Sequence, residues 1–575
     1  MSVLFNGRRI VHPGGYDAMD ASGLTQVSDP ISNLPIVVGQ SDSGAPGQVR
    51  WFTSVEMAEN YLVSGEALDA LKVMFSPRPE GGGGASRIGV LITNELTRAV
   101  LAVGGLRFVS YVYGTFGNNI RVKLENGTLA GTKRLMVRRW DKNLTEVYDN
   151  LGASFYIKYN GDEAFAEATI TAVDGKATNL EVKVGATEAT SVVDLSVPLT
   201  GEIATITDLI NHLSSIPEYT VYMAGGTLSS DVPVSALVAK KASIKAETLL
   251  TVDPALDLIS QVTNLSDIIY VEKDPEVAAL SNFIDTPLAG GQKGTSPNSW
   301  STAINSLRTV YHDILVILSD KANIHAEATR HVQQMELRNQ KQVLFTGGGI
   351  GETPAQAKQR AQILNSSRVV LGYPDIYLPG TTEGVRPAYF TGAILAGRVA
   401  GLSATEPITF DLFNVLSLGR EMVAGDPDID ELIEAGVATL ELTRNNTIRL
   451  AQGVTTYTGQ DNVLYKEISV RRGADAVSEH VRSGLEQLFV GTKGLSMTPS
   501  SVTTATIDLL NERGEQGTQD ILGFRNIQVS FENTAVRVDY EVAMVEPINF
   551  VLVTSHFVPG STITGAVNSA ESEDF

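Results

Sequence analysis

The chain has 575 residues, of which 43% are hydrophobic, and a formal net charge of −21 at pH 7. This length is more than one hydrophobic core usually holds, so we expect about three or four domains of a folded protein rather than a disordered chain. The acidic surface argues against nucleic acid as a partner, and the absence of cysteine excludes disulfides, thiolate metal sites and cysteine nucleophiles.

Residues 1–26 are predicted to form an N-terminal arm, because they contain too little apolar material for a self-supporting unit. They also lack the apolar core of a secretory signal, and no run approaches the ~18 apolar residues of a membrane-spanning helix, so we expect folding in a cytoplasm without membrane insertion. The arm is either a frayed terminus or a strand donated to the sheet edge of a neighbouring copy. Its short extended pieces consist of Val3, Leu4, Phe5, Ile10 and Val11.

Residues 27–105 are predicted to begin a core domain. Short apolar runs at 36–39 and 88–92 are typical of buried strands. A helix capped by Thr53 and Ser54 and a glycine loop at 81–84 lie between them.

Residues 106–245 change character, because alternating apolar and polar residues dominate and Asn-Gly and Asp-Gly pairs separate the runs. The pattern predicts a β-rich insertion domain, either a sandwich or a small barrel. A single helix is expected near its end, at 206–213.

Residues 246–445 alternate helical and strand patterns, which predicts an α/β middle domain with helices on both faces of a sheet. Helices are expected at 299–311, 322–338, 354–364, 391–401 and 427–436. Strands are expected at 268–271, 313–318, 343–346, 368–371, 439–442 and 448–450.

Residues 446–558 are predicted to close the core. A strand at 463–470 is expected to end at Arg471-Arg472-Gly473, and an amphipathic helix from about Asp475 is expected to stop at Gly491. A helix at 501–513 and strands at 524–531, 535–544 and 548–558 follow. The last strand contains Phe550, Val551, Leu552 and Val553. The acidic segment 559–575 is either a solvated tail or a second linking arm.

Three motifs look chemical but depart from the patterns that the chemistry requires. The run TGGGIGET at 346–353 lacks the lysine of a phosphate-binding loop. The alternating aspartates from Asp426 lack the later glycine and glutamate of a calcium loop. His325 and His331 are six residues apart, whereas two helical metal ligands are usually four apart. We therefore predict a strand–helix turn, an N-capped acidic helix, and no metal or cofactor site.

Several segments, in order along the chain, resemble contractile tail sheath proteins of bacteriophages. They are HPGGYDAMDASG near the N-terminus, YGTFGNNI at 113–120, TPLAGGQKG at 286–294, and TTYT followed by EISVRRGADAV. Together with the patterns above, the resemblance implies an α+β multidomain protein. It would have a discontinuous α/β core from N- and C-terminal segments, a β-rich insertion domain, a three-layer α/β middle domain and extended terminal arms.

The resemblance implies a structural function in the virion rather than an enzymatic one. Copies would stack as hexameric rings around a tail tube, and contraction would drive the tube through the host envelope without a nucleotide. The implied partners are other copies, the tail tube protein, the baseplate and neck or terminator proteins. Two alternatives stay open: a virion-associated hydrolase of surface polymers built on 246–445, and another baseplate or tail structural protein.

The resemblance also suggests where the assembly contacts lie. The two terminal arms would pair with the strands at 524–544 of neighbouring copies, and the charged face of the helix at 475–490 would contact the tube. The tube-facing candidates are Glu479, Arg482 and Glu486. A merely solvated helix face is the alternative for these three residues.

Overall fold

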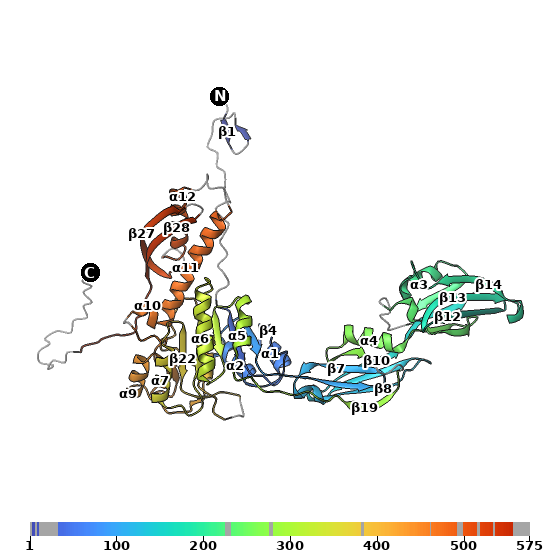
Figure 1. Ribbon diagram of the computed structural model, residues 1–575, viewed down its shortest axis with the longest axis horizontal. Coiled ribbons are helices and arrows are strands. Elements are labelled where there is room, and N and C mark those ends of the chain that lie inside the picture. Colours follow the sequence, from blue (N-terminus) through green and yellow to red (C-terminus); the bar gives the residue numbers. More distant parts are fainter. Residues whose placement is uncertain are drawn as a thin grey trace, which may run out of the picture.

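The computed structural model describes residues 3–5, 8–10, 33–224, 232–274, 280–380, 384–459, 462–491, 498–514, 518–532 and 535–555. Within these residues the chain forms an α/β body, a β-rich arm that projects to the right, and a helix–hairpin unit at the top of the body (Figure 1). Helices and strands are mixed throughout the described chain, as the α+β prediction requires.

The body is built around an eight-stranded mixed sheet with the order β26-β25-β22-β21-β20-β3-β5-β4. Its six inner strands are parallel, and the two edge strands are antiparallel to their neighbours. The strands are β3 (Pro35–Gly39), β4 (Val49–Phe52), β5 (Ile88–Ile92), β20 (Ile314–Ile317), β21 (Val343–Gly347), β22 (Val369–Tyr373), β25 (Val437–Leu442) and β26 (Ile448–Leu450).

This sheet corrects the expected separation of a first core segment from a middle domain. Strand β3 pairs in parallel with β20, which lies almost 280 residues later in the chain, so both segments share one sheet. Strand pairing over that distance leaves no local pattern in the sequence, because each strand alone shows only its own burial.

Helices cover both faces of the sheet, so the body has three layers. On one face, α1 (Val55–Leu62), α2 (Glu66–Phe75) and the fully buried α8 (Tyr389–Ala400) pack on Val37, Val316 and Phe345. The opposite face is covered by α5 (Ser301–Ser306) and α6 (Ala322–Glu336), with α7 (Pro354–Leu364) and α9 (Pro427–Glu434) beside them. Helix α8 approaches the sheet closely at Gly392, where an added Cβ would lie 2.4 Å from the Thr346 carbonyl oxygen.

The β-rich arm consists of two units, each with its own core. The proximal unit contains sheets β18-β7-β6 and β10-β9-β8-β19, and the distal unit contains sheets β15-β11-β17 and β14-β13-β12-β16. The proximal elements are β6 (Arg98–Val103), β7 (Leu106–Tyr113), β8 (Ile120–Asn126), β9 (Lys133–Arg139), β10 (Leu144–Leu151), α4 (Pro254–Leu265), β18 (Ile269–Lys273) and β19 (Phe283–Pro287). The distal elements are β11 (Ala153–Tyr159), β12 (Phe165–Val173), β13 (Lys176–Gly185), β14 (Val192–Pro198), α3 (Ile206–Ser214), β15 (Tyr219–Met223), β16 (Lys240–Ser243) and β17 (Thr248–Thr251).

The arm therefore extends beyond the expected insertion. Strands β18 and β19, which were assigned to the middle domain, pair with β7 and β8. Helix α4 was not predicted, although its start carried a signal: Asp253 caps the helix by accepting a bond from the Ala255 N–H, and Pro254 occupies its first turn.

The helix–hairpin unit corrects the expected strand at 463–470. That segment forms α10 (Val463–Lys466) and the start of the 22-residue α11 (Ile468–Phe489), with Arg471, Arg472 and Gly473 inside the helix. Gly473 lies within the helix and does not end it. Its lack of a side chain allows α11 to approach Thr405, since an added Cβ would lie 2.4 Å from Thr405 Cγ2. The predicted left-handed stop at Gly491 is confirmed by its φ of 82°.

Helix α12 (Pro499–Asn511) and the strands β27 (Ile521–Glu532) and β28 (Ala535–Met544) complete this unit close to their predicted positions. The expected strand at 548–558 is not formed as far as the description extends, to residue 555. That segment runs beside the body and joins no sheet among the described residues (Figure 1).

Candidate assembly surfaces

The hairpin β27–β28 is a two-stranded sheet that pairs with no third strand among the described residues. One face packs against α11 and α12 through Val477, Val481 and Leu509, which fixes the hairpin on the helices. The outer edges of β27 and β28 present unpaired backbone groups, and such edges are templates for a strand from another chain. The unit is therefore able to accept a strand on either side.

The C-terminal segment after β28 exposes consecutive apolar side chains. Phe550, Val551, Leu552 and Val553 are 79%, 80%, 94% and 80% exposed. Large apolar side chains in sequence are rarely left in water unless they mark an interaction site. Their extended backbone and exposure fit a segment that is covered by another molecule.

The N-terminal segment contains two short strands, β1 (Val3–Phe5) and β2 (Arg8–Ile10), which pair with each other. The register places Val3 opposite Ile10. Four of the five predicted arm residues thus lie in strands, whereas Val11 lies outside the described residues. The structure does not bring this hairpin to β27 or β28 of the same chain.

Helix α11 is fixed to the body by a buried ion network around Arg368, whose side chain is 1% exposed. Arg368 Nη1 donates to Asp475 Oδ2 at 2.7 Å, and Nη2 donates to Glu336 Oε1 at 2.6 Å. Arg471 also donates to Glu336 Oε1, at 2.7 Å. Burial disfavours the charge of Arg368, but its two carboxylate partners outweigh burial and raise its pKa. No local pattern indicates this network, since its members lie just before β22, at the end of α6 and in α11.

The three tube-facing candidates lie together on α11. Arg482 donates from Nη1 to Glu486 Oε2 at 2.7 Å and from Nε to Glu479 Oε2 at 3.1 Å. The side chains of Arg482 and Glu486 are 41% and 57% exposed, whereas Glu479 is only 21% exposed and lies in a hollow beside Tyr311. Exposed helical ion pairs contribute little to stability, so this row of charges is available for another role.

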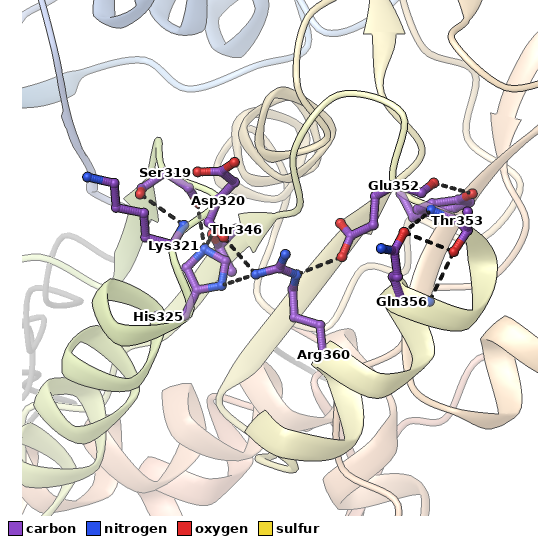
Figure 2. A network of polar contacts seen from close by, with 10 residues as sticks. Ser319, Asp320, Lys321, His325, Thr346, Glu352, Thr353, Gln356 and Arg360 are labelled. Atoms are coloured by element: carbon purple, nitrogen blue, oxygen red, sulfur yellow. Dashed lines mark hydrogen bonds and ion pairs between the residues drawn. The ribbon is translucent and has the colours of Figure 1, made fainter.

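A polar network lies at the carboxyl ends of β20 and β21, where α/β sheets often bind ligands (Figure 2). Arg360 donates to Glu352 Oε1 at 2.9 Å and to the Asp320 carbonyl at 2.8 Å. His325 Nε2 lies 2.6 Å from the Ser319 carbonyl oxygen and 2.8 Å from Thr346 Oγ1. Burial lowers the pKa of His325 to about 4, so the ring is neutral near pH 7. These groups satisfy one another.

The glycine run at 347–349 connects β21 to α7, which is the predicted strand–helix turn. The carboxylate of Glu352 packs directly against Gly348. A phosphate in this loop would therefore meet a carboxylate rather than the lysine that phosphate-binding loops use. The geometry favours a structural network over a nucleotide site.

The acidic start of α9 is a helix cap, as the sequence predicted. Asp426 accepts a hydrogen bond from the Asp428 N–H at 3.0 Å. No group of three or more His, Asp or Glu side chains suited to a metal ion occurs within the described ranges. No helix in that part of the chain is long and apolar enough to cross a membrane.

Comparison with known proteins decides the family. No family model matches the sequence. The chain is, however, 48% identical to the tail sheath protein of Bacillus phage SP01 over 561 residues, which cover 97% of both chains. The chain belongs to the phage tail sheath family. It is also 29% identical to a putative tail sheath protein of Enterococcus phage phiEF24C, over 96% of this chain and 97% of the relative.

Solved sheath structures share the fold. The sheath tail protein of Listeria innocua superposes with a TM-score of 0.54 at 13% identity, over 90% of this chain and 93% of that one. The sheath tail protein of Desulfitobacterium hafniense gives a TM-score of 0.53 at 12% identity, over 92% of this chain and all of the other. The matches therefore extend over the sheath fold as a whole rather than over a single region.

Family membership confirms three sequence predictions. This sheath protein is a structural component of the virion, it is not an enzyme, and it is a subunit of a contractile tail sheath. The hydrolase and baseplate alternatives are thereby removed. Neither the strand arms nor the tube-facing residues are tested by these comparisons, and both remain predictions.

Proposed function

We propose that this sheath protein polymerises as stacked six-subunit rings around a tail tube, and that contraction of an extended, metastable assembly drives the tube through the host envelope. The observation that carries the proposal is the isolated hairpin β27–β28, with two open edges, in a chain that also exposes an apolar extended C-terminal segment. Energy would come from a lower-energy packing of the same subunits, trapped behind a barrier, so no nucleotide is consumed.

The subunits would be linked by strand exchange. Residues 1–11 of one copy and the segment after about residue 548 of another would add to the two edges of β27–β28 in a third. Each main-chain hydrogen bond contributes roughly 0.5–1.5 kcal/mol net, and every copy repeats the contact. Because such a ladder tolerates rotation about its flanking linkers, neighbours would stay attached while the other interfaces change.

Electron microscopy of the purified protein tests the linkage. The full chain is expected to form hollow tubes on concentration, and a chain lacking residues 1–20 is expected to remain folded without forming tubes. A matched control replaces residues 12–20 by a Gly/Ser segment of equal length, which keeps residues 1–11 and should preserve tubes. Normal tubes from the deletion would refute strand exchange through this arm.

A second contact would hold the tail tube. Charged and hydrated contacts release more readily than an apolar seal, and the row Glu479, Arg482 and Glu486 supplies such a surface. Reversing all three charges should reduce copurification of the tube with the sheath and leave sheath tubes intact. Unchanged copurification would indicate that these three residues form only a solvated face of the helix. The baseplate and the neck or terminator proteins would contact the two ends of the polymer.

A further inference from the structure

One face of the four-stranded sheet β10-β9-β8-β19 in the proximal unit is unusually basic. The alternate residues Val122, Leu124, Leu135 and Val137 are buried in the core of the unit. The intervening residues therefore point to the opposite face, because side chains alternate along a strand. We call this face the basic sheet face; its basic residues are Arg121, Lys123, Arg134 and Arg138, and Glu125 lies among them.

The charge of this region opposes that of the chain. Residues 120–143 contain seven lysines or arginines and only two carboxylates, although the whole chain has a net charge of −21. The register of β8 and β9 places Arg121 directly opposite Arg138. Like charges in that position destabilise a sheet, so a compensating partner is expected.

The unit supplies only part of that compensation. Arg121 donates to Asp285 Oδ2 at 2.6 Å, and Lys123 and Arg134 both approach Glu125. Arg138 has no carboxylate partner among the described residues; its Nε contacts the sulfur of Met136 at 3.1 Å. The basic sheet face thus keeps an excess of positive charge that another molecule can neutralise.

The distal unit carries the opposite charge. Burial raises the pKa of Tyr159, and the nearby carboxylates raise it further. These carboxylates form what we call the acidic patch: Asp162, Glu163, Asp194 and Glu218. Asp194 accepts a bond from the Tyr219 hydroxyl, and Lys245 lies 5.0 Å from the centre of the Tyr159 ring. None of the four carboxylates forms an ion pair within the part of the chain that the structure describes.

We propose that the basic sheet face of one copy docks on the acidic patch of the distal unit of a second copy. The inference rests on the proposed self-assembly and adds to it a contact between projecting arms. Charge complementarity selects a second copy, because every copy brings both surfaces in equal number. The surfaces lie on different units of one arm, so the contact is head-to-tail and repeats around a ring or helix.

Cysteine crosslinking tests the contact, and the absence of native cysteine makes the experiment clean. In assembled tubes, Arg138→Cys with Asp194→Cys should give a ladder of covalent multimers with a short bismaleimide. The control pairs Arg138→Cys with Val173→Cys, because Val173 is 59% exposed at the far end of strand β12. If tubes form but the crosslinked ladder is no stronger than in this control, the contact between β-rich arms is refuted and self-assembly is not. A full chain that never forms tubes would instead contradict self-assembly as well.

A charge swap separates a second copy from any other anionic partner. Arg134→Glu with Arg138→Glu should lower tube yield about tenfold at moderate salt. Lys176→Glu with Lys240→Glu makes the same charge change on exposed lysines of the distal unit and should have little effect. Adding Asp194→Arg and Glu218→Arg to the first variant should restore the yield. An unchanged yield after the first reversal, or a loss that the swap does not restore, would overturn the proposal.

Discussion

Arg368 and Asp475 are 107 positions apart in the sequence, yet Arg368 Nη1 lies 2.7 Å from Asp475 Oδ2 inside the protein. The pair joins the residue just before strand β22 to the helix against which the hairpin β27–β28 packs. Forces on the hairpin are therefore transmitted to the eight-stranded sheet through a buried charge pair and the apolar contacts of α11.

Replacing Asp475 by Asn should destabilise the chain by about 1–3 kcal/mol, because Arg368 keeps its buried charge but loses a charged acceptor. Urea denaturation of the monomer measures this loss. Glu486→Gln, on the exposed part of the same helix, is the matched control and should change little. Equal stability of the two variants would show that the network is not important for folding.

Removing residues 545–575 should abolish tube formation, because the exposed apolar segment at 550–553 is then missing from every copy. Removing only residues 559–575 should preserve tubes if the acidic end is a solvated tail. Electron microscopy distinguishes the two truncations. Loss of tubes from the shorter truncation would instead assign a linking role to the acidic end.

Burial raises the pKa of Glu467 from its ordinary 4.5 to about 7. A raised folded pKa means that the group favours the folded state when protonated. That contribution is fully present below about pH 4.5 and is lost as the pH rises through 7. Glu467→Gln keeps the neutral form, so its stability relative to the original chain should rise from pH 5 to pH 8. A stability difference between the variant and the original chain that does not change with pH would contradict the raised pKa of Glu467.

Gly473→Ala should destabilise the protein by about 1–3 kcal/mol, although alanine is the better helix former. The new methyl group would lie 2.4 Å from Thr405 Cγ2. Thr405→Ser removes that methyl group and keeps the hydroxyl that donates to Asp520 Oδ1 at 2.8 Å. The double variant should therefore recover most of the loss in a thermal unfolding measurement. If the double variant recovers no stability, the clash with the Thr405 methyl group is not the cause of the loss.

Local patterns predicted elements well where the helix or strand ends carry chemical signals. Helix α7 was predicted at its observed limits; in the structure Thr353 caps it, Pro354 begins it and Asn365 ends it in a left-handed conformation. The segment at 463–470 was assigned wrongly because five apolar residues within eight positions fit a strand as well as a buried helix face. Gly473 added to the error, because a glycine usually interrupts a helix. Here the glycine instead makes room for Thr405 of a neighbouring segment.

Pairing between distant segments could not be predicted in the same way. The burial of β3 was visible in its apolar run, but nothing local indicates β20 as its neighbour. Similarly, the charged row on α11 could be found from helical spacing, whereas the network around Arg368 depends on three elements meeting in space. Family resemblance, rather than physical pattern, supplied the function.

The two open edges of β27–β28 determine how many strands each copy can accept in the proposed polymer. Under the proposed strand exchange, each copy would accept two strands and donate two, so every edge inside the lattice would be filled. At one end of a finite sheath, the hairpin edges of the last layer would receive no strand. At the other end, the terminal arms of the last layer would have no edge to join. Capping proteins at the two ends must therefore be chemically different, one offering strands and the other offering an edge.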